Sequence, residues 1–289
     1  MDNKIILVTG GAGFIGSNLI KKLVNDKRNI IVSLDNYSTG KKSNHIEGVE
    51  YIKGNSKNIG KHIKVKPHFI FHLGEYSRVE KSFSDIDKVF KYNHDSIYPV
   101  LKFASKNKSK IIYSGSSTKF DAKKGFLLSP YTWTKSINSE LIKAYSSWND
   151  LNYAIVYFYN VYGPNELDGE YGTLIGKFKK SMRNGKKLNI VLPGNQRRNF
   201  THVSDIVEGL ILISEKGQGD EFGIGNEKSF SIIQVADLFG GEKKFIKKRK
   251  GNREDSILIT KKTEELGWKA SHELIDYITN IKKNEWIDK

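Results

Sequence analysis

The chain has 289 residues and contains no cysteine. This absence excludes disulfide bonds, a catalytic thiol and thiolate metal ligands, and it agrees with a reducing compartment. No apolar run approaches the roughly 18 residues that span a membrane, and no apolar segment typical of a secretion signal precedes the first predicted strand. No group of His, Asp and Glu has the spacing of a metal site. We therefore expect a soluble cytoplasmic protein that contacts no membrane and holds no metal.

Negative charge is scarce relative to positive charge. Lys and Arg number 48 against 32 Asp and Glu, which gives a net charge of +16. Short basic runs occur at 243–244 and 247–250, but lysines are spread through every segment of the chain. This even spread argues against a dedicated nucleic-acid-binding face. The positive field instead favours the approach of a small anionic ligand.

Apolar runs of strand length alternate with helical patterns, which is typical of a Rossmann-type, doubly wound α/β fold with a parallel sheet. We expect strands at Lys4–Thr9, Ile30–Asp35, Val49–Lys53, Phe69–Leu73, Lys110–Ser114 and Tyr153–Phe158. We expect helices near Phe14–Asn25, Asp85–Lys106 and Thr132–Trp148. Ligands of such folds bind outside the carboxyl ends of the strands.

A glycine-rich turn joins the first predicted strand to the first helix. Gly10, Gly13 and Gly16 follow the apolar run 5–8 with the spacing G-x-x-G-x-x-G. Glycines let the backbone approach a pyrophosphate, and the helix N-terminus adds partial positive charge. The second apolar run ends in Asp35, whose carboxylate can accept hydrogen bonds from an adenosine ribose and would repel a 2′-phosphate. The pattern predicts an NAD site.

The regular alternation weakens after Phe158, and the remaining chain predicts a smaller C-terminal α/β lobe. A helix and a short strand are expected before Gly194, and Ser231–Phe239 and His272–Trp286 have helical patterns. Phe200–His202, with the helical segment after it, is expected to return to the main sheet. We therefore assign residues 1–158 and roughly 199–222 to an NAD-binding domain, and residues 159–198 and 223–289 to a substrate lobe.

A phenol and an ammonium lie four residues apart in Tyr131-Thr132-Trp133-Thr134-Lys135, at the start of a predicted helix and thus on one face. Pro130 suits the first turn of that helix. A close lysine cation, joined by the positive charge of a bound nicotinamide, favours the phenolate and makes Tyr131 a candidate general base. Ser116 follows the preceding strand and can share a substrate proton with Tyr131. We predict Ser116, Tyr131 and Lys135 as a catalytic set.

The chain resembles the extended short-chain dehydrogenases/reductases, in their nucleotide-sugar epimerase and dehydratase branch. The resemblance covers nearly the whole length and rests on the glycine turn, Asp35-Asn36-Tyr37-Ser38-Thr39-Gly40, Phe71-His72-Leu73, the Ser116/Tyr131/Lys135 set, Asn160-Val161-Tyr162-Gly163-Pro164, Arg197-Arg198-Asn199-Phe200-Thr201-His202-Val203 and Leu266-Gly267-Trp268. It implies a tightly held NAD that is reduced and reoxidised in each turnover. It also implies homodimers that pair the helices near 85–106 and 132–148.

The resemblance assigns roles to individual residues of this sequence. It implies that NAD is bound by Gly10, Gly13, Phe14, Ile15, Gly16, Asp35, Asn36, Ser38, Thr39, Gly40, Asn55, Leu73, Gly74, Tyr131 and Lys135. It implies that the nucleotide-diphosphate sugar is bound by Ser116, Ser117, Tyr131, Asn160, Arg198 and Arg249, the two arginines gripping the diphosphate. In this scheme Tyr131 removes the proton of the sugar 4-hydroxyl while hydride leaves C4.

The branch of the chemistry depends on the residues after Ser116. Dehydratases of the family have Asp-Glu there, and UDP-glucuronate decarboxylases keep the Glu, whereas this chain has Ser117 and Thr118. The resemblance therefore favours a nucleotide-sugar 4-epimerase that serves surface-polysaccharide synthesis. The alternative is a 4,6-dehydratase or another C4-oxidising dehydrogenase or reductase, and Glu75 is an acid that can enter the site from the neighbouring strand end. A catalytically idle RNA-binding relative is a further alternative, against which the intact catalytic set argues.

Several positions depart from the family pattern. Gly74-Glu75 replaces a small pair that is usually Ala-Ala, Asn55 replaces an Asp that reads adenine, and Tyr157 replaces an Arg. Asn199 and Asn252 replace acids. Asp255-Ser256, where some 4-epimerases have a bulky aromatic residue, leaves room for an N-acetyl group. His72, His94 and His202 lie in or near apolar segments and are expected to be structural.

Overall fold

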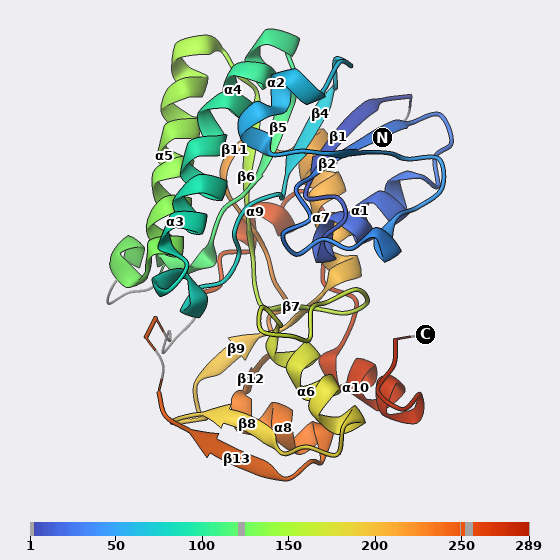
Figure 1. Cartoon of the computed structure of the whole chain (residues 1–289), viewed down its shortest axis with the longest axis vertical. Coiled ribbons are helices and arrows are strands. Elements are labelled where there is room, and N and C mark those ends of the chain that lie inside the picture. The colour runs from blue at the N-terminus through green and yellow to red at the C-terminus, as the bar shows by residue number, and fades with distance from the viewer. Residues whose placement is uncertain (1–2, 121–124, 249, 252–256, 289) are drawn as a thin grey trace.

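The computed structural model describes residues 3–120, 125–248, 250–251 and 257–288 (Figure 1). A seven-stranded parallel sheet with the order β11-β6-β5-β4-β1-β2-β3 forms the larger part. Its strands are β1 (Ile5–Thr9), β2 (Ile30–Asp35), β3 (Glu50–Lys53), β4 (Phe69–His72), β5 (Lys110–Ser114), β6 (Tyr153–Phe158) and β11 (Gly219–Ile224). The predicted Rossmann-type class is confirmed. The strand order reverses between β1 and β4, which is where such sheets bind ligands.

Helices cover both faces of this sheet (Figure 1). One face is covered by α1 (Phe14–Leu23) and α7 (Val203–Lys216), and the other by α2 (Ile59–His62), α4 (Asp95–Asn107) and α5 (Pro130–Asn149). Side chains alternate between the two cores, so that Ile6 and Val8 face α1 and α7 while Leu7 faces α2 and α4. Because both faces are buried, the strands are continuous apolar runs in the sequence.

A smaller α/β lobe lies below the sheet in Figure 1. It consists of β7 (Val161–Tyr162) paired with β10 (Thr201–His202), β8 (Leu188–Val191) with β13 (Lys243–Ile246), β9 (Arg197–Asn199) with β12 (Ser229–Ser231), and helices α6 (Leu174–Arg183), α8 (Ile232–Phe239) and α10 (Leu274–Lys283). The lobe has its own core, in which Phe178, Phe239 and Ile278 are buried. Across the described ranges, no helix combines the length and the apolar composition needed to cross a bilayer.

The helix expected at Asp85–Lys106 is not continuous. The structure has α3 (Ile86–Val89), a π-helical turn (Phe90–His94) and then α4. The extra residue in the π turn rotates the helix face, and buried Asn93 then accepts a hydrogen bond from the Tyr76 backbone N–H at 2.7 Å. The apolar periodicity of the segment shows which face is buried but not this local change of pitch.

The segment that returns to the main sheet also differs from the expectation. Thr201–His202 pairs with β7 in the lobe, and β11 takes the sheet position beside β6 after α7 crosses over. The sequence of β11 begins Gly219-Asp220-Glu221, which is a weak strand pattern. Residues 257–270 pack near the sheet, through α9 (Lys261–Glu264) and buried Trp268. The domain boundaries expected from the sequence assign this segment to the substrate lobe.

Candidate active site

A cavity of about 460 Å³ opens at the carboxyl ends of the central strands, and residues of the lobe complete its wall. Most of the predicted site residues line it, namely Gly10, Gly13, Phe14, Ile15, Gly16, Asp35, Asn36, Ser38, Thr39, Leu73, Gly74, Ser116, Ser117, Tyr131, Lys135 and Asn160. Gly40, Asn55 and Arg198 are not part of the lining. Arg249, Asn252, Asp255 and Ser256 lie outside the described residues.

The glycine turn at the end of β1 has a conformation that a larger residue cannot adopt. Gly10 has a φ of +73°, and a Cβ there would lie 2.8 Å from the Cα of Gly74. A Cβ on Gly16 would lie 2.2 Å from the carbonyl oxygen of Gly10. This packing brings the first turn of α1 to the cavity wall, where its N–H groups have no acceptor within the helix. The turn fits the pyrophosphate of a dinucleotide.

Asp35 ties the glycine turn to the end of β2. Its Oδ2 accepts a hydrogen bond from the Ala12 N–H at 2.9 Å, and its Oδ1 accepts one from the Tyr37 N–H at 2.7 Å. Burial raises the pKa of Asp35, although these two N–H groups act in the opposite direction. The carboxylate lines the cavity and keeps lone pairs for ribose hydroxyls. These features fit the ribose end of NAD.

Two predicted cofactor residues support the site from behind its lining. The side chain of Asn55 accepts a hydrogen bond from the Lys57 N–H at 2.9 Å and so caps a short helical turn. Its neighbours Gly54 and Ser56 line the cavity. Gly40 packs against Asp35, since a Cβ there would lie 2.9 Å from Oδ2 of that carboxylate.

The helix α5 carries the phenol and the ammonium to the cavity. Ser129 caps its N-terminus by accepting a hydrogen bond from the Thr132 N–H at 3.1 Å, with Pro130 in the first turn. Tyr131 and Lys135 both line the cavity, and the Lys135 Nζ donates to the carbonyl oxygen of Ser114 at 2.6 Å. The predicted pair thus lies at the end of β5.

A chain of hydroxyl groups lies beside this pair. The Oγ of Ser116 is 2.6 Å from the Oγ1 of Thr118, which is 2.8 Å from the Oγ1 of Thr132. The Oγ of Ser117 donates to the Phe158 carbonyl at 3.0 Å. The two positions after Ser116 therefore offer hydroxyls, already hydrogen bonded, and no carboxylate.

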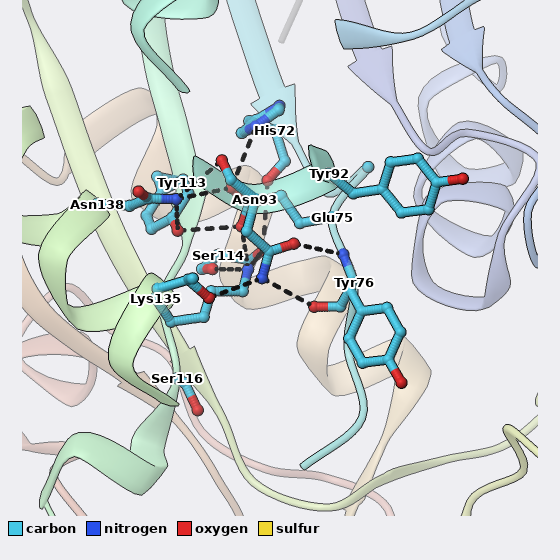
Figure 2. A network of polar contacts seen from close by, with 12 residues as sticks. His72, Glu75, Tyr76, Tyr92, Asn93, Tyr113, Ser114, Ser116, Lys135 and Asn138 are labelled. Carbon is cyan, nitrogen blue, oxygen red and sulfur yellow. Dashed lines mark hydrogen bonds and ion pairs between the residues drawn. The ribbon is translucent and has the colours of Figure 1, made fainter. Parts of the chain in front are cut away.

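Glu75 enters the site from the end of β4 and pairs with Lys135 (Figure 2). Its Oε2 is 2.5 Å from the Lys135 Nζ, and the two side chains are 1% and 4% exposed. Burial raises the pKa of Glu75, but the Lys135 cation and the contacts with His72 outweigh it, so the pKa lies below its ordinary value. The sequence left open whether this acid reaches the site. The structure places it there, and its lowered pKa favours the anion.

Sequence reasoning missed the polar side chains that surround this ion pair. Tyr113 OH donates to Glu75 at 3.0 Å, and the Nδ2 of Asn138 donates to it at 3.1 Å. Asn93, from the π turn, donates to the Oγ1 of Thr134 at 3.1 Å. The signal available in the sequence was one Asn on the buried face of each of two predicted helices, Asn93 in the helix near 85–106 and Asn138 in the helix near 132–148. Arg78 also lines the cavity, and burial lowers the pKa of its guanidinium.

On the lobe side, the predicted substrate residues are only partly brought together. Asn160 lines the cavity and donates to the Asn199 carbonyl at 3.1 Å. Arg198 is buried in β9 and donates to the Arg197 carbonyl at 2.7 Å. Tyr157, at the position of a family arginine, donates instead to Asp220 at 2.6 Å outside the cavity lining.

The three histidines have structural contacts. The Nδ1 of His72 is 2.8 Å from the Oγ1 of Thr9, and its Nε2 faces Glu75 at 3.6 Å. His202 caps α7 through the Ser204 N–H, and the His94 ring lies tilted against Trp133, with ring centroids 6.2 Å apart. His72 thus lies directly behind the Glu75–Lys135 pair.

A doubly wound sheet, a glycine turn with an acid at the end of β2, and a Tyr/Lys pair beside a serine define an NAD-binding oxidoreductase-type enzyme site. The model of the NAD dependent epimerase/dehydratase family matches residues 6–225, and the chain belongs to this family. NAD is its cofactor, and the glycine turn, Asp35 and Lys135 are the groups that would hold it.

Individual relatives differ in the reaction that their names state. The chain is 31% identical to a "Putative UDP-glucose 4-epimerase" of Methanocaldococcus jannaschii, over 96% of this chain and 97% of that protein. It is 31% identical to the UDP-N-acetyl-alpha-D-glucosaminuronate decarboxylase of Bacillus cytotoxicus, over 81% of this chain and 78% of that protein. The crystal structure of the Thermotoga maritima UDP-glucose 4-epimerase with UDP-glucose has a TM-score of 0.88 at 26% identity, covering 97% and 99% of the two chains.

Proposed function

We propose that this enzyme is an NAD-dependent nucleotide-sugar 4-epimerase that acts in the cytoplasm on a UDP- or GDP-linked sugar. The epimerase names of the Methanocaldococcus jannaschii relative and the Thermotoga maritima structure support the reaction and the nucleotide-sugar class. The alternatives are a 4,6-dehydratase and another C4-oxidising enzyme of the family.

The observation that carries the proposal is the state of the acids in the cavity. Among the described residues that line it, Asp35 and Glu75 are the acids. Asp35 accepts two backbone hydrogen bonds at the cofactor end, and Glu75 is paired with Lys135. Neither carboxylate is free to remove a proton from C5 of a sugar, as an elimination of water requires. Besides NAD, oxidation and reduction at C4 need Tyr131, Ser116 and Lys135, and no free carboxylate.

In this proposal each residue has a defined task at the sugar. The phenolate oxygen of Tyr131 takes the proton of the sugar 4-hydroxyl and returns it when C4 is reduced. The Ser116 hydroxyl hydrogen-bonds the same sugar oxygen, and the Lys135 ammonium favours the phenolate. Asn160, in the cavity lining, binds the diphosphate. The family pattern gives the same task to Arg198, which is outside the lining, and to Arg249, which is outside the described residues. When bound, NAD would supply the hydride acceptor and donor. Inversion at C4 requires that the 4-keto sugar rotate in the cavity, so that the hydride returns to its other face.

The direct test is proton NMR of the purified enzyme, with and without added NAD, mixed with UDP- and GDP-hexoses and their N-acetyl forms. We expect the anomeric and H4 signals of a C4-inverted sugar. A 6-deoxy methyl doublet would instead reveal a dehydratase and contradict the proposal. UDP-glucuronic acid is included because a pentose product would reveal a decarboxylase.

We also propose that the enzyme is a homodimer built from α4 and α5 of each copy. Large apolar side chains on this side of the molecule are exposed, with Trp148 71%, Tyr98 54% and Ile137 38% accessible. Light scattering after size exclusion should give about twice the 32.9 kDa chain mass, and Tyr98→Glu should give a monomer. A wild-type mass of one chain would refute the dimer without affecting the epimerase proposal.

A further inference from the structure

We propose that Glu75 is a positioning residue: its carboxylate holds the Lys135 ammonium at the end of β5 and offsets its charge, and thereby sets the pH range in which Tyr131 acts as the base. This inference rests on the proposed function for its catalytic consequence. The ion pair itself is independent of that function.

The geometry leaves the lysine few alternatives. An ammonium has three donors. The Lys135 Nζ reaches Glu75 Oε2 at 2.5 Å, the Ser114 carbonyl at 2.6 Å and the Ser114 Oγ at 3.3 Å (Figure 2). The first two contacts are short and fix the ammonium between β4 and β5. The third contact, to the Ser114 Oγ, is longer, so the N–H group that makes it can instead donate to a ligand in the cavity.

The carboxylate is equally constrained, which makes it a positioning group and not a reactant. Oε2 also accepts from Tyr113 OH at 3.0 Å, and Oε1 accepts from Asn138 at 3.1 Å. His72 Nε2 lies 3.6 Å from Oε1. Four neighbours therefore hold a side chain that is 1% exposed.

The electrostatic consequence follows from the balance of charge. A lysine cation near Tyr131 favours the phenolate, and a carboxylate 2.5 Å from that cation cancels much of its field. Two other titratable groups contact Glu75, His72 of β4 and Tyr113 of β5. The cavity lining adds Tyr92 from the π turn, Arg78 from the segment after β4 and Tyr131 from α5. Among them Arg78 is the second cation of the cavity lining, and Glu75 is the anion that faces Lys135.

The experiment compares the pH profiles of kcat and kcat/KM for wild type and Glu75→Gln with UDP-glucose, and with UDP-N-acetylglucosamine if only that sugar turns over. Glutamine keeps the shape and can still accept from Lys135, but it removes the charge. We expect the acid limb of both profiles to move to lower pH by roughly one unit, with the maximal rate within a few-fold of wild type. In Glu75→Ala, which also removes the contact, the maximal rate should fall more than tenfold.

Asp220→Asn is the matched control. Asp220 also pairs with a lysine of α5, Lys143 at 2.8 Å, and accepts from a tyrosine, Tyr157 at 2.6 Å, but all three lie outside the cavity lining. This variant should lose stability without moving the acid limb. An unmoved limb in Glu75→Gln, or an equal shift in Asp220→Asn, would overturn the inference. The inference would also be overturned if the acid limb of the pH profile disappeared in His72→Asn, because the limb would then report the histidine and not Tyr131.

A second measurement needs no substrate. The thermal unfolding midpoints of Glu75→Gln, Lys135→Met and the double variant form a cycle. We expect the double variant to lose clearly less than the sum of the single losses, because either substitution already removes the attraction between the two charges. Additive losses would overturn the inference. If the cycle shows coupling but wild type turns over no nucleotide sugar, the proposed function fails and the ion pair stands.

Discussion

At the scale of single residues, removal of the phenol oxygen of Tyr131 should stop turnover without releasing NAD. Tyr131→Phe keeps the ring in the cavity wall but removes the proton acceptor, so we expect turnover to fall by roughly 10²–10⁴-fold. NAD should remain bound, because the glycine turn and Asp35 are untouched. The NMR assay measures turnover, and chromatography of the denatured protein measures retained nucleotide. Tyr145→Phe, on the same helix but outside the cavity lining, is the control. Full activity in Tyr131→Phe would contradict the assignment of the base.

The residues that could be predicted from the sequence are those whose neighbours along the chain define them. Tyr131 and Lys135 share one helix face, and Asp35 ends a strand, so local spacing places each of them at the cavity. The Glu75–Lys135 pair joins the segment just after β4 to the first part of α5, and these two elements are far apart in the chain. Its existence depends on strand register and helix rotation, which no local pattern encodes.

At the scale of elements, the turn between β1 and α1 is specified by close backbone contact. In Gly10→Ala the new Cβ meets the backbone of Gly74 at 2.8 Å in a left-handed conformation, and neither side can yield. We expect a loss of about 2 kcal/mol in the free energy of unfolding and at least tenfold weaker NAD binding. Urea unfolding and calorimetric titration with NAD measure these.

Gly60→Ala supplies the control for this turn. Gly60 lies in α2 with open space around its Cα, so alanine should be neutral or should stabilise by up to about 1 kcal/mol. Equal NAD affinity in Gly10→Ala and wild type would show that the cofactor does not lie over this turn.

The π turn is the element that periodicity could not predict, and its stability can be tested. Asn93 accepts from the Tyr76 N–H and donates to Thr134, with no exposed surface. Asn93→Ala leaves these groups without their partner, at a cost of about 1–3 kcal/mol in the free energy of unfolding. Asn107→Ala, which loses a part-buried local bond in α4, should cost less than about 0.5 kcal/mol. Similar losses in the two variants would mean that Asn93 does not hold the turn.

At the scale of the whole molecule, the sheet and the lobe have separate cores but share the cavity wall. The sequence predicted two parts because the strand–helix alternation stops after β6. It did not predict that the segment after β13 comes back to the sheet, where Trp268 donates to the Asp205 carbonyl at 2.9 Å. Asp205 and Trp268 are far apart in the chain, and a lone tryptophan has no local pattern that indicates its partner. The junction between the two parts is therefore a tertiary feature.

His202 lies at this junction and makes it sensitive to acid. It caps α7 and stacks on His272, with ring centroids 4.5 Å apart. Burial, with a further contribution from His272, lowers the pKa of His202 to about 4. The unfolded chain takes up this proton near pH 6.5 and the folded protein only near pH 4. The contribution of His202 to stability is therefore complete above pH 6.5 and is lost as the pH falls towards 4.

Over this interval His202 should account for about 3 kcal/mol of lost unfolding free energy. In His202→Asn the asparagine can still cap α7, but it takes up no proton. The variant should thus lose less free energy of unfolding than wild type between pH 7 and pH 4.5, as measured by urea unfolding at each pH. His94→Asn, on an exposed side chain, should follow the wild-type curve. If His202→Asn loses as much as wild type, another group causes the acid sensitivity, and the junction is held by contacts that do not titrate.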